Sequence, residues 1–303
     1  MSGARIDRRA ALVRLGRAGL LLGGAGLLGA AGLLSRGRWA YSGKRPRPIP
    51  DHRVAADPAL PVLAVARGAD PARIVGAAVD RVGGIGRFVR PGEVVLLKPN
   101  MGWDRAPEQG ANTHPAVVAE MVRQCRRAGA RRVIVADVPV HDAMRCAERS
   151  GIRRATREAG GDMLLPPATG FTPAVLGGAV LSAWDVLDAL FLADKLINLP
   201  VVKDHALSRL TCGFKNWYGL LGGTRARLHQ DVHLAIADLG AAMRPTLTVV
   251  DATRVMMRGG PTGGRLDDVV TVNAIAAGTD PVALDAWAAT QLKLDPHDVP
   301  HIV

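Results

Sequence analysis

Short β-branched runs alternate with helix-like stretches from Pro61 onwards, and this alternation limits the fold more than any other feature of the sequence. The first run, Val62–Ala66, is followed by Asp70 and Pro71, a pair that is typical of the N-cap and first turn of a helix. The pattern then repeats as strand, helix and strand, predicted at Glu93–Lys98, Pro115–Ala128 and Arg132–Asp137. These three elements form a βαβ unit, in which the two strands run parallel.

The second half of the chain continues the same alternation. Further strands are predicted at Ala189–Leu199, Thr246–Asp251 and Val269–Ala276, and further helices at His229–Ala242 and Pro281–Leu292. The sequence therefore predicts an α/β domain over residues 59–303, with a mostly parallel sheet and helices on both faces. No GxGxxG motif opens a helix, which disfavours a dinucleotide site.

Ligands of open parallel sheets bind beyond the carboxyl ends of the strands, so we expect a site in the loops after Leu97, Asp137, Leu199 and Asp251. The first loop carries Lys98 and Asn100, and His114 stands at the start of the next helix. A lysine, an imidazole and exposed helical N–H groups together suit a carboxylate or phosphate. A structural interpretation fits equally well, with His114 or Thr113 capping the helix and Lys98 in solvent.

Residues 198–233 contain the densest group of reactive side chains, beginning with Lys203. Lys215 lies between Phe214 and Trp217 and close to several glycines. Aromatic walls exclude water from an amine and lower its pKa, so Lys215 is a candidate functional amine. Asp285, further along, either points at the same site or faces solvent on its helix.

Histidines are also frequent in this part of the chain, at His205, His229 and His233. A neutral histidine can take up a proton, bind a metal or do neither. His229 and His233 are one helical turn apart, but the Glu of the HExxH motif is absent between them. We therefore do not expect a zinc-protease site.

The N-terminal segment has the organisation of an export signal. Arg8 and Arg9 precede an uncharged stretch rich in Gly, Ala and Leu, Ala18–Leu34, and adjacent arginines are typical of twin-arginine signals. Residues 1–34 are predicted to be such a signal or a membrane anchor, with cleaved and anchored forms both open. Residues 35–58, rich in Pro and Arg, are predicted to be an exposed linker.

An export signal predicts both partners and location. The twin-arginine export machinery would recognise residues 1–34, and the membrane would hold the protein if that segment is retained. The folded domain would then lie in the periplasm or at the outer face of the cytoplasmic membrane. Residues 18–34 could instead form a buried helix of the domain, but their many glycines disfavour a helix.

The formal net charge of +12 does not indicate a nucleic-acid partner. Residues 1–58 hold 11 Lys and Arg against 3 Asp and Glu, so most of the basic excess lies in the leader and linker. Membrane targeting explains that distribution better than a groove that follows phosphates. We expect no nucleic-acid binding.

The three cysteines, Cys125, Cys146 and Cys212, are far apart and form no CxxC pair. Such pairs are typical of zinc and iron–sulfur sites, so an iron–sulfur cluster is not expected. An oxidising compartment would permit one disulfide, for example through Cys146 or Cys212, but we expect none.

Several separated motifs resemble the domain of unknown function 362 family. They are Lys98-Pro99-Asn100, Lys203-Asp204-His205, Phe214-Lys215-Asn216-Trp217-Tyr218-Gly219, His229, Gly260-Pro261 with Gly263-Gly264, and Asp280-Pro281-Val282-Ala283-Leu284-Asp285. The resemblance covers roughly residues 62–303. Some members of that family carry a cysteine-rich ferredoxin segment, which has no counterpart here, so the family gives no reason to assign an iron–sulfur cofactor.

A remoter resemblance is to the nickel-pincer lactate racemase superfamily. The order His205, Lys215, His229 is similar to a histidine base, a cofactor-bearing lysine and a nickel-binding histidine, and His114 is similar to the second base. This resemblance implies a nickel-type cofactor held by Lys215 and a metal at His229. The sequence context of the lysine differs from that superfamily, however, so the cofactor stays unassigned and another metal is an alternative.

Together these observations predict an exported enzyme that acts on a small anionic substrate by proton transfer. His114 and His205 would transfer the protons, and Lys215 and His229 would hold a cofactor or metal. The substrate would be bound by four polar side chains, Lys98, Asn100, Lys203 and Asn216. We expect Lys98, His114, His205 and Lys215 to meet in one cleft. The alternative is a noncatalytic envelope protein that binds an anionic ligand with the same loops.

Overall fold

The computed structural model describes residues 45–303, except residues 167 and 169. The predicted twin-arginine signal or anchor at residues 1–34 lies outside the described residues, as does the first part of the predicted linker. Within the described part, no helix is both long and apolar enough to cross a membrane.

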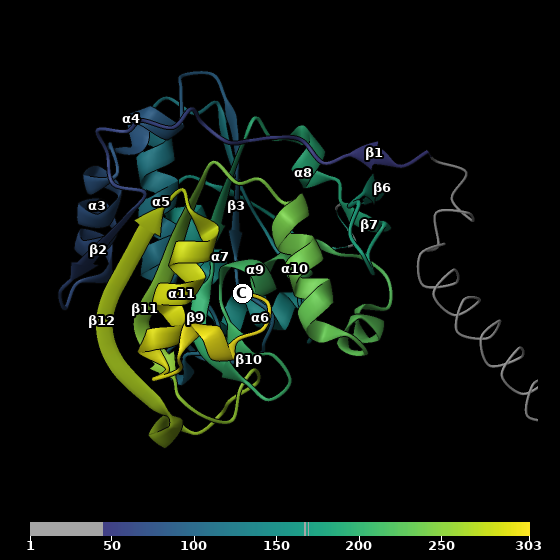
Figure 1. The fold of residues 1–303 in the computed structure, drawn as a ribbon. Helices are drawn as coiled ribbons and strands as arrows, with labels where there is room; N and C mark the ends of the chain where they lie inside the picture. The colour runs from purple at the N-terminus through teal and green to yellow at the C-terminus, as the bar shows by residue number, and fades with distance from the viewer. Residues whose placement is uncertain (1–44, 167, 169) are drawn as a thin grey trace, which may run out of the picture.

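A nine-stranded sheet forms the centre of the molecule (Figure 1). Seven of its strands follow the order β10-β9-β11-β8-β3-β4-β5, while β12 pairs with β11, and β2 pairs with β12. The strands are β2 (Leu63–Arg67), β3 (Val94–Pro99), β4 (Arg132–Ala136), β5 (Asp162–Leu164), β8 (Lys195–Leu199), β9 (Val201–His205), β10 (Arg209–Thr211), β11 (Leu247–Met256) and β12 (Val269–Gly278).

The sheet is mixed, so the prediction of a mostly parallel sheet is corrected. The pairs β3–β4, β3–β8, β4–β5, β11–β8 and β11–β9 are parallel, whereas β9–β10, β11–β12 and β12–β2 are antiparallel. The reason is connection length. A parallel return needs a crossover, usually a helix, but residues 257–268 between β11 and β12 contain only a short 3-10 helix. The second strand therefore folds back beside the first.

Helices cover both faces of the sheet, as predicted. Alternate residues of β3 separate the two layers, because Val95 and Leu97 join the core cluster that contains α3 and α5, and Leu96 joins the cluster that contains α10. A third cluster lies under α11. The helices are α3 (Pro71–Arg81), α4 (Ile85–Phe88), α5 (Pro115–Arg127), α6 (Ala143–Arg149), α7 (Ile152–Glu158), α8 (Ala189–Leu192), α9 (Gly213–Asn216), α10 (Val232–Ala242) and α11 (Pro281–Gln291).

Several predicted elements have different boundaries in the structure, and the strand predicted at Thr246–Asp251 extends to Met256. The predicted strand Ala189–Leu199 is a helical turn, α8, followed by β8, because a short apolar run does not distinguish a buried helix from a strand. The predicted helix His229–Ala242 begins as a 3-10 helix, Arg225–His229, and continues as α10. Asp70 accepts hydrogen bonds from its helix, as the sequence indicates, and Asp280 caps α11 in the same way.

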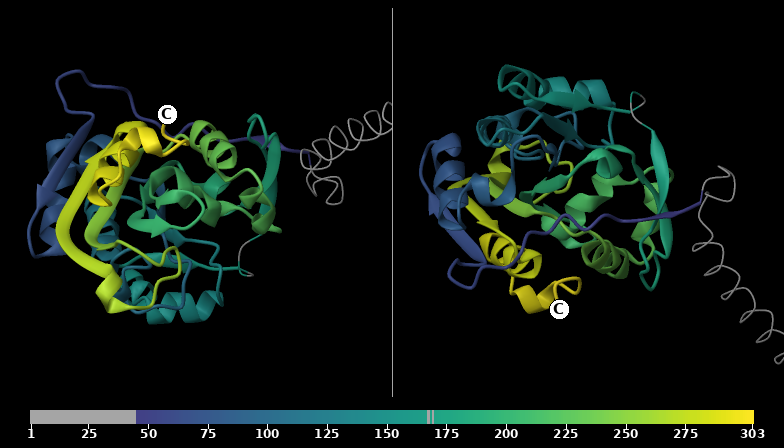
Figure 2. Two further views of the ribbon diagram at one scale, coloured as in Figure 1. Left: turned by 60° about the horizontal axis from the view of Figure 1, so that its bottom comes forward. Right: turned by 90° about the horizontal axis from the view of Figure 1, so that it is seen from above.

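A small second sheet, β1-β6-β7, lies beside α10 and away from β12 (Figure 1). It consists of β1 (Arg47–Pro48), β6 (Phe171–Val175) and β7 (Ala183–Leu187). In the right-hand view of Figure 2, the purple segment after residue 44 runs from this sheet across the molecule towards α3. His52 in that segment is buried and its carbonyl accepts a hydrogen bond from Thr246. Most of residues 45–58 are exposed, and His52 is the buried residue that attaches this segment to the domain.

The three cysteines are buried and unpaired. Burial raises the pKa of Cys125 and of Cys146 to about 12, and it raises the pKa of Cys212 as well. Buried thiols of this kind are unreactive, which agrees with a packing role.

Candidate functional site

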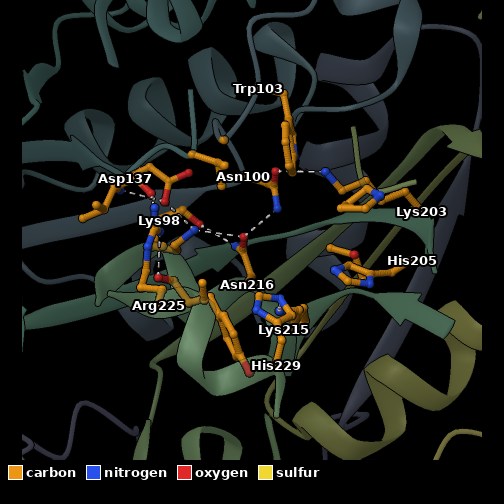
Figure 3. Close-up of a pocket in the computed structure, with 18 of the residues that line it drawn as sticks. Lys98, Asn100, Trp103, Asp137, Lys203, His205, Lys215, Asn216, Arg225 and His229 are labelled. Carbon is orange, nitrogen blue, oxygen red and sulfur yellow. Dashed lines mark hydrogen bonds and ion pairs between the residues drawn. The ribbon is translucent and has the colours of Figure 1, made fainter. Parts of the chain in front are cut away.

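A pocket of about 410 Å³ opens at the carboxyl ends of β3 and β4, as the strand pattern predicts. The β9–β10 hairpin, α9 and the 3-10 helix Arg225–His229 supply its other walls (Figure 3). It brings together seven of the eight predicted site residues: Lys98, Asn100, Lys203, His205, Lys215, Asn216 and His229.

Lys98 lies near the end of β3 and is 1% exposed. Its Nζ is 2.9 Å from Asp137 Oδ1 and donates to Asn216 Oδ1 at 2.9 Å and to the carbonyl of Pro99 at 2.6 Å. Three acceptors satisfy the three N–H groups of an ammonium. Burial lowers the pKa of Lys98, and the charge of Asp137 opposes this shift. Lys98 is therefore fully paired within the protein.

The chain passes very close to this ion pair at Gly219. A Cβ atom on Gly219 would lie 1.8 Å from Asp137 Oδ1 and 2.5 Å from Lys98 Nζ, so no other residue fits without movement. Arg225, which the sequence analysis did not select, closes the same end and donates to the carbonyl of Val138 at 2.6 Å. Arg225 begins a short 3-10 helix, which gives no periodic signal that would have identified it.

Two asparagines connect this end to the rest of the pocket (Figure 3). Asn216 donates to the carbonyl of Lys98 at 3.1 Å and to Asn198 Oδ1 at 2.8 Å, and its own Oδ1 accepts from Asn100 at 3.2 Å. Asn100 Oδ1 in turn accepts from Lys203 Nζ at 3.3 Å. The amide groups of both residues thus form hydrogen bonds within the protein, and these bonds fix the wall of the pocket.

The β9–β10 hairpin presents one polar face to the pocket. Lys203 and His205 are two residues apart on β9, and Thr211 is the cross-strand partner of Lys203, so all three share that face. Lys203 Nζ contacts Asn100 and the carbonyl of Ala111. Burial lowers the pKa of Lys203 to about 7. Thr211 Oγ1 is buried and, within the described part of the chain, has no hydrogen-bond partner.

His205 is held in one tautomer by the backbone. Its Nδ1 accepts from the N–H groups of Leu207 at 3.2 Å and Ser208 at 3.3 Å, so the neutral ring carries its proton on Nε2. Burial, reinforced by the charges of Lys215 and Lys203, lowers the pKa of His205 to about 3. At neutral pH this geometry suits a hydrogen-bond donor better than the predicted proton-transfer group.

Lys215 lies across the pocket from Asn100, close to His229 (Figure 3). It is 7% exposed, and its Nζ lies 3.2 Å from the centre of the Tyr218 ring and 3.5 Å from His229 Nε2. Burial lowers the pKa of Lys215 to about 7. The predicted aromatic walls, Phe214 and Trp217, pack in the hydrophobic core instead. An aromatic ring does cover the amine, but Tyr218 supplies it.

A buried carboxylate fixes the start of α9, the helix that carries Lys215. Asp285 of α11 accepts from the backbone N–H groups of Gly213 at 2.6 Å and Phe214 at 3.1 Å. Burial raises the pKa of Asp285 to about 6. The sequence analysis placed Asp285 either at the pocket or in solvent, but it lies beneath α9 and positions that helix.

His114 is not brought to the pocket. It is the N-cap of α5, where its Nδ1 accepts from the backbone N–H of Ala116 at 3.0 Å. Its own backbone N–H donates to Asp251 Oδ2 at 2.7 Å. The expected meeting of four residues in one cleft therefore holds for Lys98, His205 and Lys215 but not for His114, and the capping interpretation is the one found.

The pocket has a strong excess of positive groups. The described residues that line it include four lysine and arginine side chains, Lys98, Lys203, Lys215 and Arg225. The acidic side chain among them is Asp137. Asp137 pairs with Lys98. The other three have no carboxylate within ion-pair distance in the described structure, so the pocket favours an anion.

The described residues contain no group of three or more His, Cys, Asp and Glu side chains arranged to hold a metal ion. The rings of His205 and His229 are stacked with their centres 6.2 Å apart. A metal at His229 would consequently need further ligands from a bound molecule. Lys215 is next to His229 and could hold such a molecule through its amine.

Comparisons with known proteins place these observations in a family. The chain is 31% identical over 237 residues to a thylakoid-associated protein of Synechocystis sp., a match that covers 73% of this chain and 70% of that relative. The model of the family described as Domain of unknown function (DUF362) matches residues 95–290.

Two solved structures are also similar, at lower levels. A protein from Thermotoga maritima matches with a TM-score of 0.48 and 13% identity, and the lactate racemase apoprotein from Thermoanaerobacterium thermosaccharolyticum with 0.39 and 12%. These matches cover 75% and 79% of this chain, respectively. In the other direction, they cover 60% and 58% of the solved chains, so this chain spans about three fifths of each. Neither match carries a functional assignment. The family model and the curated relative agree with the sequence motifs, and the chain belongs to the DUF362 family.

Proposed function

We propose that this protein is an enzyme that binds a small organic anion in the pocket and transfers a proton on it. The observation that carries this proposal is the charge of the lining: besides the paired Lys98 and Asp137, it contains Lys203 and Arg225 and, among the described residues, no further carboxylate. Cations held in a cavity that excludes water attract an anion strongly and orient it.

The hairpin face is the proposed binding site for the anionic group. Lys203 supplies positive charge, His205 supplies an Nε2–H donor that its tautomer fixes, and Thr211 supplies a buried hydroxyl without a partner in the described structure. A carboxylate offers acceptors to all three. Lys98 and Asn216 are given a framing role, because their hydrogen-bonding groups are already used.

Lys215 is the proposed group that acts on the bound anion. Burial lowers its pKa to about 7, so a large part of the amine is unprotonated at neutral pH and able to accept a proton. His229 Nε2, 3.5 Å from Lys215 Nζ, is placed to exchange protons with it. This assignment moves the proton-transfer role from His205 and His114 to Lys215 and His229.

A second candidate function uses a cofactor. The 3.5 Å between Lys215 Nζ and His229 Nε2 fits a group that is attached to the amine and carries a metal bound by the imidazole. Such a metal would supply a Lewis acid for a substrate oxygen. Elemental analysis and intact mass of the purified protein separate this candidate from the first, because only a held cofactor adds mass and metal in proportion to protein.

We also propose that the protein is exported and acts at a membrane surface. The arginine pair Arg8-Arg9 and the apolar stretch Ala18–Leu34 support export, and the name of the Synechocystis relative supports an association with membranes. Replacing Arg8 and Arg9 together by Lys should keep the folded protein in the cytoplasm, because the export receptor reads guanidinium groups rather than charge alone. Fractionation of cells that express either form tests this, and unchanged export of the double-Lys form contradicts it.

Binding and proton transfer are tested with two measurements. Lactate and pyruvate should each raise the thermal unfolding midpoint of the protein, and Lys203→Met should remove most of that rise. Arg132→Met, which removes an exposed charge on β4, serves as the control. In deuterated water, NMR should show that deuterium replaces the protons on the carbon next to the carbonyl group of pyruvate. Stabilisation without exchange supports the noncatalytic binding protein, and no stabilisation by either anion contradicts the proposal.

A further inference from the structure

The surroundings of the Lys215 amine differ from those of an ordinary buried lysine. Within the described part of the chain, no carboxylate lies within ion-pair distance of Lys215 Nζ. Its closest neighbours are the face of the Tyr218 ring, 3.2 Å from the centroid, and His229 Nε2 at 3.5 Å. Burial without a counter-ion favours the neutral amine with a free lone pair, while the face of Tyr218 attracts the ammonium and opposes this effect in part.

A neutral buried amine is a nucleophile as well as a base. Lys215 is buried in the pocket lining and, among the described residues, has no carboxylate to hold it as an ammonium, so its lone pair is available to a bound electrophile. His229 also hydrogen-bonds to the backbone of Ala226 and turns Nε2 towards the amine. The imidazole can therefore take the proton that the amine loses when it attacks a carbon atom.

The groups that would bind a carboxylate stand beside this amine. Lys203 and His205 lie on β9, and the chain passes from β10 directly into α9, which carries Lys215. All three groups line the same pocket, and the ring of His205 stacks against that of His229, which contacts Lys215. A ligand that bridges them needs an anionic group next to an electrophilic carbon.

We propose that Lys215 forms an imine with the carbonyl carbon of a small 2-oxo acid, whose carboxylate is bound by Lys203, His205 and Thr211. This inference rests on the proposed function, since it names the substrate class and the covalent step of the same pocket. A 2-oxo acid fits because its carbonyl carbon is bonded directly to the carboxylate that the hairpin face would hold.

The step balances without any further reactant. The lone pair of Lys215 Nζ forms a bond to the carbonyl carbon, and the C=O π electrons move to oxygen. One proton passes from nitrogen to the oxygen, with His229 Nε2 placed to relay it, and a second proton comes from solvent; the nitrogen lone pair then forms the C=N bond as the C–O bond breaks and water departs. The product is a protonated C=N bond, which draws electrons from the neighbouring carbon and so promotes loss of a proton from it. No oxidant or reductant is needed.

Borohydride trapping tests the imine directly. The full-length protein is incubated with pyruvate, reduced with sodium borohydride and measured by intact mass and peptide mapping. We expect one reduced pyruvate adduct, located on Lys215, and none with lactate, which has the same carboxylate but a hydroxyl in place of the carbonyl. Lys215→Arg should lose the adduct. Lys195→Arg should keep it, because Lys195 pairs with Glu93 away from the pocket.

The outcomes separate this inference from the proposed function. Stabilisation of the protein by pyruvate without any trapped adduct, or an adduct on another lysine that Lys215→Arg retains, overturns the imine and leaves anion binding in place. Failure of both pyruvate and lactate to stabilise the protein overturns both proposals. Should Lys215→Arg not fold, as thermal unfolding would show, Lys215→Met and the mapped position of the adduct in the wild-type protein decide the question.

Discussion

Lys98 and Lys215 line the same pocket, and both are nearly inaccessible to solvent, yet their surroundings are opposite. Lys98 is bound by a carboxylate, an amide oxygen and a carbonyl. Lys215 has an aromatic ring and an imidazole as its closest partners. The pocket therefore has a paired end, at Lys98 and Asp137, and an unpaired end, at Lys215 and His229.

The two ends of the pocket have different roles: the paired end stabilises the fold, and the unpaired end carries the reactive group. At the paired end every hydrogen-bonding group of Lys98 is used, so the residue stabilises the fold and has nothing left for a ligand. At the unpaired end the protein maintains a desolvated amine, which opposes folding and makes the group reactive. The two lysines should consequently respond to the same substitution with opposite signs.

The largest effect is expected at the paired end. Lys98→Met leaves the buried carboxylate of Asp137 without its cation, and breaking a buried pair in this way lowers the free energy of unfolding by about 3–5 kcal/mol. Urea denaturation measures this loss. Arg132→Met, which breaks the exposed pair with Asp162, should change stability by less than about 1 kcal/mol. Equal losses in the two variants would contradict the distinction.

The paired end was also the more predictable one. Lys98 and Asp137 end two strands that the sequence identifies, and the carboxyl ends of neighbouring parallel strands meet. The unpaired end depends on Tyr218 and His229, which come from short 3-10 segments without hydrophobic periodicity. The resemblance to the racemase superfamily placed Lys215 and His229 in one candidate site, but the sequence indicated Phe214 and Trp217, not Tyr218, as the rings around the amine.

The errors have a common origin in tertiary contacts. His114 was a candidate for the pocket because it follows the first loop, but a backbone contact with Asp251 holds it at the start of α5. The antiparallel direction of β12 depends on contacts between distant parts of the chain, and so do the hydrogen bonds that bring Arg225 to the pocket. Local signals such as the Asp70 cap act within a few residues, and that cap was identified correctly.

The second prediction concerns the support of the unpaired end. The pKa of Asp285 is raised from 3.8 to about 6 by burial, so the folded state holds a proton that the unfolded state loses between these values. The contribution of Asp285 to stability should fall by about 2–3 kcal/mol as pH rises from 4 to above 6. The difference in unfolding free energy between wild type and Asp285→Asn, measured across this range, should show the fall. A pH-independent difference would count against the raised pKa.

The third prediction tests how tightly the paired end is packed. Gly219→Ala places a Cβ where Asp137 Oδ1 now lies and should lower the free energy of unfolding by about 1–3 kcal/mol. Gly86→Ala is the matched control, because nothing lies within 4 Å of its added Cβ, and it should be neutral or slightly stabilising. If both variants unfold at the same denaturant concentration as wild type, the close approach at Gly219 is not required.

The smallest effect is expected at the unpaired end, and its sign is the informative part. Lys215→Met replaces a desolvated amine with an apolar chain of similar length and should raise the free energy of unfolding at pH 7 by about 0.5–2 kcal/mol. Because the pKa of Lys215 is lowered from 10.5 to about 7, the unfolded chain binds a proton between these values that the folded chain does not. Wild-type stability should therefore rise relative to Lys215→Met as pH increases from 7 to 10.5, and at pH 10.5 the wild type should be the more stable of the two. Denaturation at pH 7, 9 and 10.5 measures this reversal. A destabilised Lys215→Met at pH 7 would mean that the amine has an ionic partner and that the two ends of the pocket are alike.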